Sequence, residues 1–139
     1  MIANYTTTVS AEKSLAEVMR MLAHHGARQV LVENGASGVP AALSFRIREM
    51  GFRLPIYPEA LLKTLRCDGA PPRYCTLEHA NDVAWRVIRD WLRAQLALIE
   101  SGMVALDEIM LPYALTSSGQ TALERYRDGT LLLDRPVTS

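Results

Sequence analysis

Three strand-like segments follow one another in the first half of the chain with no helical segment between them. They span residues 27–33, 39–47 and 52–57, and residues that favour turns separate them. Parallel neighbours in a sheet need a long crossover connection, usually a helix, so short connections favour antiparallel pairing. This order argues against a doubly wound parallel fold and predicts an antiparallel sheet.

Apolar residues alternate along the second and third of these segments, "VPAALSFRI" and "FRLPIY". A period of two places them all on one face of the sheet and leaves the polar residues on the other face. The inward set is Val39, Ala41, Leu43, Phe45, Ile47, Phe52, Leu54 and Ile56. Pro55 lacks a backbone donor, so the strand that contains it is predicted to lie at an edge of the sheet.

A first strand and a first helix are predicted ahead of these segments. "YTTTV" (5–9) is rich in β-branched and aromatic residues, which are typical of a strand. Ser14 and Glu17 form a capping-box pattern in front of an apolar stripe, and Gly26 is placed to end that helix as a left-handed cap.

Helical patterns fill the rest of the chain. Pro58 is expected at the first position of a short helix, and a long helix is predicted over roughly 77–101. Shorter helices are predicted within 105–115 and 117–129, and the tail 130–139 is expected to add a strand or to lie on the surface.

The predicted fold class is therefore α+β. We expect a β-α-β-β-β antiparallel sheet covered on one face by helices, followed by the long C-terminal helix and short helices. A chain of 139 residues fits a single domain, 1–139, with the sheet and two helices in 1–66 and a helical part in 75–139.

Composition and charge limit the classes of function. The chain has 15 basic and 15 acidic residues, so any attraction to nucleic acid or to a membrane surface must be local. No basic segment followed by an apolar run opens the chain, and no run of about 18 apolar residues occurs. With only two cysteines as well, we expect a cytoplasmic protein with reduced thiols and no membrane association.

The long helix carries more apolar circumference than one sheet face can cover. Its apolar residues extend from the main stripe toward the opposite side, where another helix or another subunit is needed to bury them. We therefore predict a homo-oligomer, a dimer or larger, with Trp85, Trp91, Val87 and Leu98 at the interface.

Three arginines lie on the polar side of the second and third strand-like segments. If Met50 and Gly51 are the central residues of a tight turn, Ile47 faces Leu54 and Phe45 faces Ile56. The same register places Arg48 opposite Arg53, and Arg46 next to Pro55. Directly opposed like charges are unfavourable, so this pairing favours a bound anion. The predicted ligand-binding set is Arg46, Arg48, Arg53, Thr6, Thr8 and Ser44, with Gln29 on the same face.

Two other interpretations of these arginines stay open. The guanidinium groups could simply solvate the outer face of a half-exposed sheet while their stems cover apolar surface. They could also meet carboxylates of a neighbouring subunit. Phe45 and Phe52 are predicted to point inward, so this face lacks the aromatic platforms of many single-strand binders.

No pattern in the chain predicts a reaction, a metal or a cofactor. Phosphate-binding glycine loops, nucleophile elbows and zinc-protease motifs are missing from the sequence. Cys67, Cys75 and His79 are close in sequence, but the step between the two cysteines is not that of a zinc knuckle. We expect a protein that is not an enzyme and that binds neither a metal nor a cofactor.

Two long segments and one short one resemble a family of small uncharacterised proteins encoded by tailed phages and prophages. They are "YTTTVSAEKSLAEVMRMLAHHGA", "AWRVIRDWLRAQLALIESGMVALDEIMLPY" and "FRLPI". The resemblance implies a mobile-element origin, the bacterial host cytoplasm and an accessory role without catalysis. It implies no established activity.

The leading hypothesis for function is binding of a phosphate-bearing partner, most simply single-stranded DNA or RNA, through the arginine-bearing face. The first alternative is sequestration of a small signalling nucleotide by an oligomer. The second is inhibition or adaptation of a host protein through the apolar helix surface.

Overall fold

The structure, a computed structural model, describes residues 1–35, 38 and 40–133 and has an α+β fold. Its strands form one antiparallel sheet in the order β1-β2-β3. The strands are β1 (Ala27–Asn34), β2 (Pro40–Ile47) and β3 (Met50–Pro55). The helices are α1 (Ala11–His24), α2 (Pro58–Cys67), α3 (Leu77–Glu100), α4 (Leu106–Met110) and α5 (Ala122–Arg127), with 3-10 turns η1 (Pro72–Tyr74) and η2 (Leu111–Tyr113). The α+β class, the antiparallel sheet and the edge position of Pro55 are confirmed.

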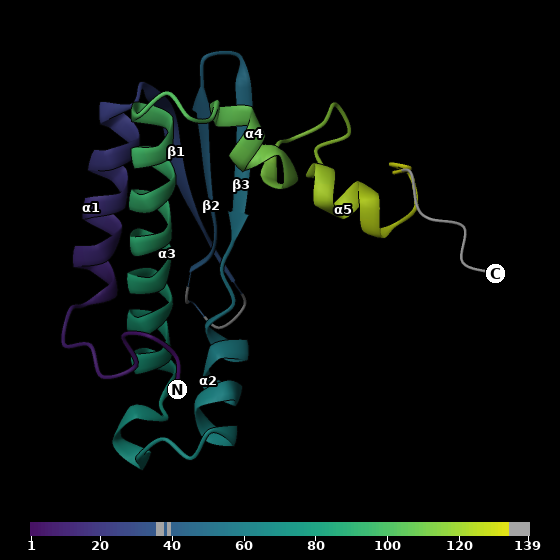
Figure 1. Ribbon diagram of the computed structural model, residues 1–139. Coiled ribbons are helices and arrows are strands. Elements are labelled where there is room, and N and C mark those ends of the chain that lie inside the picture. The colour runs from purple at the N-terminus through teal and green to yellow at the C-terminus, as the bar shows by residue number, and fades with distance from the viewer. Residues whose placement is uncertain (36–37, 39, 134–139) are drawn as a thin grey trace.

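Helices α1 and α3 pack side by side on the apolar face of the sheet (Figure 1). Their inward residues join the alternating residues of β2 and β3 in one core, with Trp85, Phe45 and Phe52 the largest side chains fully buried in it. The predicted inward set is confirmed for every member except Val39, which lies outside the described residues, and Ala41, which is half-buried.

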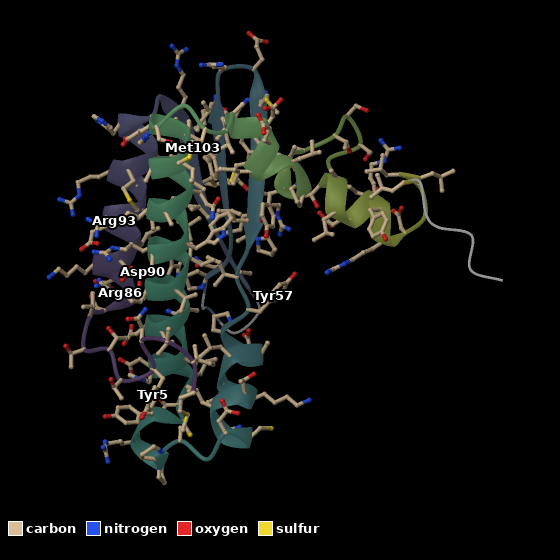
Figure 2. All side chains as sticks on the ribbon, viewed as in Figure 1. Tyr5, Tyr57, Arg86, Asp90, Arg93 and Met103 are labelled. Carbon is tan, nitrogen blue, oxygen red and sulfur yellow. The ribbon has the colours of Figure 1, made fainter. Side chains whose placement is uncertain are left out.

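The predicted first strand at residues 5–9 is wrong. Residues 3–6 form turns, and the sheet in the described part of the chain has three strands. The ring of Tyr5 packs edge-on against Tyr74 at a centroid distance of 5.6 Å, and its carbonyl oxygen contacts Nε2 of His79. These contacts hold the segment beside the start of α3 (Figure 2), so tertiary contacts outweigh its β propensity.

Helix α1 begins earlier than the predicted capping box. Ser10 is the N-cap, and its hydroxyl accepts a hydrogen bond from the backbone N–H of Lys13 at 3.2 Å. Ser14 lies within the helix and is fully buried, so the capping role predicted for it is wrong. The predicted C-terminal end of α1 is confirmed, because Gly26, directly after the C-cap residue His25, adopts a φ of +85°.

The predicted register of the β2–β3 hairpin is also wrong. The turn is formed by Arg48 and Glu49, so Ile47 pairs with Met50 and Phe45 pairs with Phe52. The two phenylalanine rings lie 5.4 Å apart between centroids, inside the core. The turn is two residues earlier than predicted, and because this shift is even, the inward and outward faces are unchanged.

Gly51 has a packing role inside β3 instead of a turn role. A Cβ at this position would lie 3.0 Å from Nη1 of Arg46 and 3.2 Å from Cδ1 of Leu115. The backbone N–H of Leu115 donates to the Gly51 carbonyl at 2.8 Å, and Phe52 bridges to Ala114. The missing side chain therefore lets the segment after η2 lie against the outer edge of β3.

The C-terminal helices are shorter than predicted. The 105–115 segment becomes α4 followed by η2, and the 117–129 segment becomes α5 with Thr121 as its N-cap. Residues 130–133 contain no strand, and the rest of the predicted tail lies outside the described residues. Among the described helices, none is both long enough and apolar enough to cross a bilayer.

Candidate functional site

The predicted arginine set is dispersed along the outer face of the sheet. Arg53 faces Ser44 across β2 and β3, and its Nε lies 2.8 Å from Oε2 of Glu33 on β1. Arg48 is in the turn with a φ of +56°, so the predicted Arg48–Arg53 pair does not form. Arg46 remains on the outer face, and its cross-strand partners are Gly51 on one side and Arg28 on the other.

Thr6 and Thr8 do not share this face. Both precede α1, in the segment that Tyr5 attaches to the beginning of α3. Figure 2 shows Tyr5 near one end of α3 and Met103 near the other, and Figure 1 shows the β2–β3 turn at the Met103 end. The two threonines are therefore removed from the predicted ligand set.

The predicted interface residues of α3 have different environments. Trp85 is fully buried in the core of its own chain, so it cannot be the interface residue predicted for this helix. Val87, Trp91 and Leu98 are half-buried. Helices α1 and α2 and the sheet cover much of α3, so less of its apolar surface is left for a second subunit to bury. Self-association stays a prediction, which light scattering can measure.

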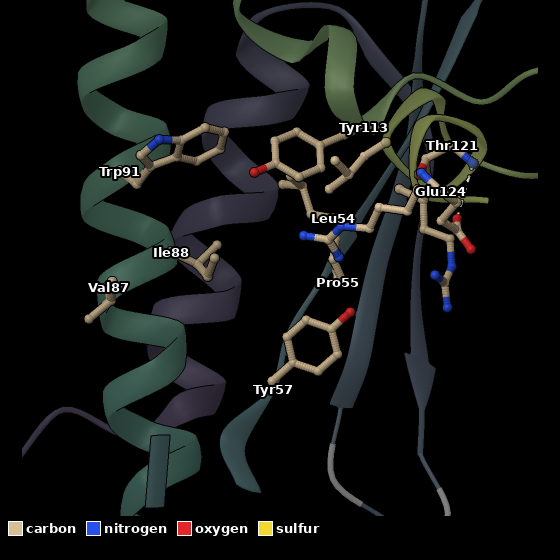
Figure 3. A pocket seen from close by; sticks show the side chains of 12 residues that line it. Leu54, Pro55, Tyr57, Val87, Ile88, Trp91, Tyr113, Thr121 and Glu124 are labelled. Atoms are coloured by element: carbon tan, nitrogen blue, oxygen red, sulfur yellow. Dashed lines mark hydrogen bonds between the residues drawn. The ribbon is translucent and has the colours of Figure 1, made fainter. Parts of the chain in front are cut away.

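A cleft of about 490 Å³ opens beside α3, and Val87 and Trp91 belong to its wall. It lies between α3 on one side and β3, η2 and α5 on the other (Figure 3). Figure 3 shows Trp91 and Ile88 facing Thr121 and Glu124 across the opening, with Tyr113 and Tyr57 between them. Of the predicted site residues, the structure thus brings Arg53, Val87 and Trp91 together.

Aromatic rings dominate the cleft. Trp91 and Tyr113 pack edge to face, with 6.0 Å between ring centroids and 83° between ring planes. Tyr57 precedes α2, where Pro58 begins the helix, and 63% of its surface is exposed. An edge-to-face pair next to an exposed ring offers a planar ligand flat apolar surface and two phenolic hydroxyls.

Helix α5 supplies the far wall through a capping box. The Thr121 hydroxyl accepts from the backbone N–H of Glu124 at 3.1 Å, and Oε1 of Glu124 accepts from the Thr121 backbone N–H at 3.0 Å. Hydrogen bonds from Thr121 hold the pKa of Glu124 below its usual value, and the positive charge of Arg53 contributes to this. Glu124 is therefore ionised at neutral pH.

Two arginines bring positive charge to the cleft, and their surroundings differ. Arg53 is shared between the cleft and its ion pair with Glu33. Arg127, in the last turn of α5, is exposed, and within the described residues its side chain makes no ion pair or hydrogen bond. Among the described residues, Arg127 is the cation of the cleft whose side chain has no partner, so it can meet an anion.

The polar side chains of the cleft are hydroxyl, carboxylate and guanidinium groups. Among the described residues that line it, none is histidine, cysteine or serine. Cys67, Cys75 and His79 lie elsewhere, and the described residues contain no cluster of three or more side chains suited to a metal ion.

Four residues of the cleft were not predicted from the sequence: Tyr57, Tyr113, Glu124 and Arg127. A local signal existed for only part of this set, because Thr121 and Glu124 have the spacing of a capping box. That spacing predicts where α5 begins but does not say which helix it faces. The cleft exists because η2 and the segment after it return to the edge of β3.

Comparisons with protein-family models, with curated proteins and with solved structures found no match.

Proposed function

We propose that the protein binds a small nucleotide in the cleft between α3 and α5. The observation that carries this proposal is that three aromatic side chains and an arginine without a described partner line the same cavity of about 490 Å³. Pockets for small molecules commonly measure about 300–1,000 Å³ and combine apolar walls with a few polar groups.

Each part of a nucleotide has a complementary group here. A base can lie against Trp91, Tyr113 and Tyr57, and stacking on an aromatic ring contributes about 1–3 kcal/mol per base. A phosphate suits Arg127, because a guanidinium group presents several donors in a plane. Sequestration of a nucleotide without catalysis also fits the accessory role that the resemblance to phage-encoded proteins implies.

Intrinsic fluorescence tests the proposal directly, because the two tryptophans differ in environment. Trp91 lines the cleft, whereas Trp85 is fully buried and serves as an internal reference. We expect a panel of mononucleotides to quench the emission and at least one to saturate the signal. In Trp91→Phe the saturable response should disappear while the Trp85 emission stays.

Two arginine variants distinguish a direct contact between Arg127 and the nucleotide from an effect of the protein's total charge. Arg127→Gln should weaken binding about 10-fold, in line with the loss of one charge-assisted contact. Arg93→Gln removes the same charge from an exposed site on α3 outside the cleft and should leave binding unchanged. The proposal fails if no mononucleotide at millimolar concentration gives a saturable response, or if Arg93→Gln weakens binding as much as Arg127→Gln.

A further inference from the structure

Arg28 and Arg46 form a pair of like charges on the open face of the sheet. They are Cα partners across β1 and β2, and both are exposed. Within the described residues neither takes part in an ion pair, whereas Arg53 on the same face has Glu33. Directly opposed like charges in a sheet are unfavourable by up to about 1 kcal/mol, and the Arg46 guanidinium turns toward Glu49 and Gly51, away from β1, so both groups stay available to an anion.

The Arg46 guanidinium is positioned by the backbone around it. Its Nη2 donates to the Glu49 carbonyl oxygen at 3.1 Å, and its Nη1 lies over Gly51, where a Cβ would be only 3.0 Å away. Gly51 and the Glu49 carbonyl therefore orient the group while most of its five donors stay available. Orientation of this kind lowers the entropy that an arginine loses when it binds an anion.

A hollow of about 360 Å³ lies next to this pair. Arg46 lines it and Arg28 does not. The other lining residues are Gln29, Val30, Leu31, Ser44, Phe45, Phe52 and Leu115, so most of the wall is apolar. The register of β1 shifts between Arg28 and Leu31, and Gln29 there has a φ of +54°, which is rare for a residue other than glycine. Bulges of this kind change the direction of side chains and are common beside binding sites. The surface thus combines guanidinium, hydroxyl and amide groups with the exposed apolar side chain of Leu31.

We propose that this Arg28–Arg46 face binds the sugar–phosphate backbone of single-stranded nucleic acid. Guanidinium groups match phosphate oxygens, and the Ser44 hydroxyl and Gln29 amide can hydrogen-bond to sugar or phosphate. The outward residues Arg28, Leu31 and Arg46 are exposed, so this part of the face is accessible to an extended polymer, and Leu115 borders it at Gly51. Phe45 and Phe52 point into the core, so recognition is independent of base sequence.

Local charge also explains how a protein with 15 basic and 15 acidic residues attracts a polyanion. Arg48 in the adjacent turn adds a third positive charge at the same end of the sheet. Contacts from two or three arginines to a single strand predict that log K falls with log salt at a slope of about −1.4 to −2.

Fluorescence anisotropy with a labelled 20-nucleotide oligo(dT) tests the proposal in the whole 139-residue chain. We expect measurable binding at low salt with the slope given above. Arg28→Gln and Arg46→Gln should each weaken binding about 10-fold and reduce the slope by about 0.7. Arg93→Gln, at an exposed position on α3, is the matched control and should change neither quantity. All four proteins should keep the same mononucleotide response of Trp91, because the arginine face and the cleft are built from different residues.

Three results would overturn the proposal. The first is no binding of oligo(dT) at low salt by protein whose thermal melt is cooperative. The second is an equal loss of binding in Arg93→Gln and Arg46→Gln, which would assign the effect to total charge. The third is equal affinity for polyglutamate, which would show that any polyanion suffices. None of these results bears on the nucleotide cleft, which the Trp91 titration tests separately.

Discussion

Arg53 on β3 forms an ion pair with Glu33 on β1, although β1 and β3 are not neighbours in the sheet. The Nε–Oε2 distance is 2.8 Å, and the pair passes over the outer face of β2, where Ser44 is the partner of Arg53. The pair therefore links both edges of the sheet across the central strand. It also distinguishes Arg53 from Arg46 and Arg48, the other two arginines of the predicted ligand set, because neither of these forms an ion pair within the described residues.

A double-mutant cycle on Arg53 and Glu33 should give a small favourable coupling. Both side chains are about one-third exposed, at 34% and 40%, so we expect about 0.2–1 kcal/mol in the free energy of unfolding. Arg53→Gln, Glu33→Gln and the double variant, unfolded in urea at low and at high salt, measure it. Salt should reduce the coupling. A coupling of zero at low salt would mean that the pair does not stabilise the sheet.

Arg48→Gly should stabilise the hairpin. Arg48 has a φ of +56° in the two-residue turn, a region that glycine adopts without the steric cost of a Cβ. We expect the free energy of unfolding to rise by about 0.5–1 kcal/mol. Glu49→Gly is the matched control, because Glu49 does not have a positive φ and glycine there should destabilise the protein by a similar amount. Stabilisation by both variants, or by neither, would contradict the conformation of this turn.

The inward face of the sheet was predictable because alternation in a strand is local. Phe45, Phe52 and Leu54 are buried as their spacing indicates, whichever register the hairpin adopts. The register itself was not predictable in this way. Glycine at position 51 suggested a turn, but its small size is needed because Leu115, 64 positions later, lies against it.

The candidate site was predictable only in part for the same reason. Trp91 and Val87 stood out because an apolar helix face needs a partner, and they do line the cleft. Within the chain, Trp91 packs against Tyr113, and α5 lies across the cleft from both residues. No local pattern shows that residues 113–127 return to β3, because tertiary packing decides that contact.

Acid should weaken the connection between α1 and α3. Nε of Arg89 on α3 donates to Oε2 of Glu17 on α1 at 2.5 Å, and Nη1 of Arg89 donates to Oδ1 of Asp90 at 2.7 Å. The side-chain amide of Asn4 donates to Oδ2 of the same aspartate. The hydrogen bond from Arg89 holds the pKa of Glu17 below its usual value of 4.5. The pKa of Asp90 is also lowered: burial acts to raise it, but hydrogen bonds from Arg89 and Asn4 outweigh that effect.

A carboxylate whose pKa is lower in the folded state stabilises the protein above its unfolded pKa and loses that effect as the pH falls through the folded value. We therefore expect the Tm to fall as the pH is lowered from about 5 toward 3. Arg89→Gln should lower the Tm at pH 7 and flatten this acid-dependent decline. Thermal melts at several pH values measure both effects. Equal pH dependence in wild type and Arg89→Gln would mean that other carboxylates cause the acid sensitivity.

The capping box of α5 should control the cleft as well as the helix. Thr121 is almost fully buried, and α5 is short, so loss of the cap removes a large share of what orders it. Thr121→Ala should lower stability by about 1 kcal/mol and leave the α5 backbone less protected from hydrogen exchange than the core helices. Because Glu124 and Arg127 line the cleft from α5, nucleotide binding measured through Trp91 should weaken in the same variant.

Thr121→Ser keeps the hydroxyl that accepts from the Glu124 N–H and should restore both properties. Thr64→Ala on α2 is a control for a threonine outside the cleft and should leave nucleotide binding unchanged. If Thr121→Ala weakened the α5 cap but left nucleotide affinity intact, α5 would not be part of the binding site and the ligand would rest on Trp91, Tyr113 and Tyr57 alone.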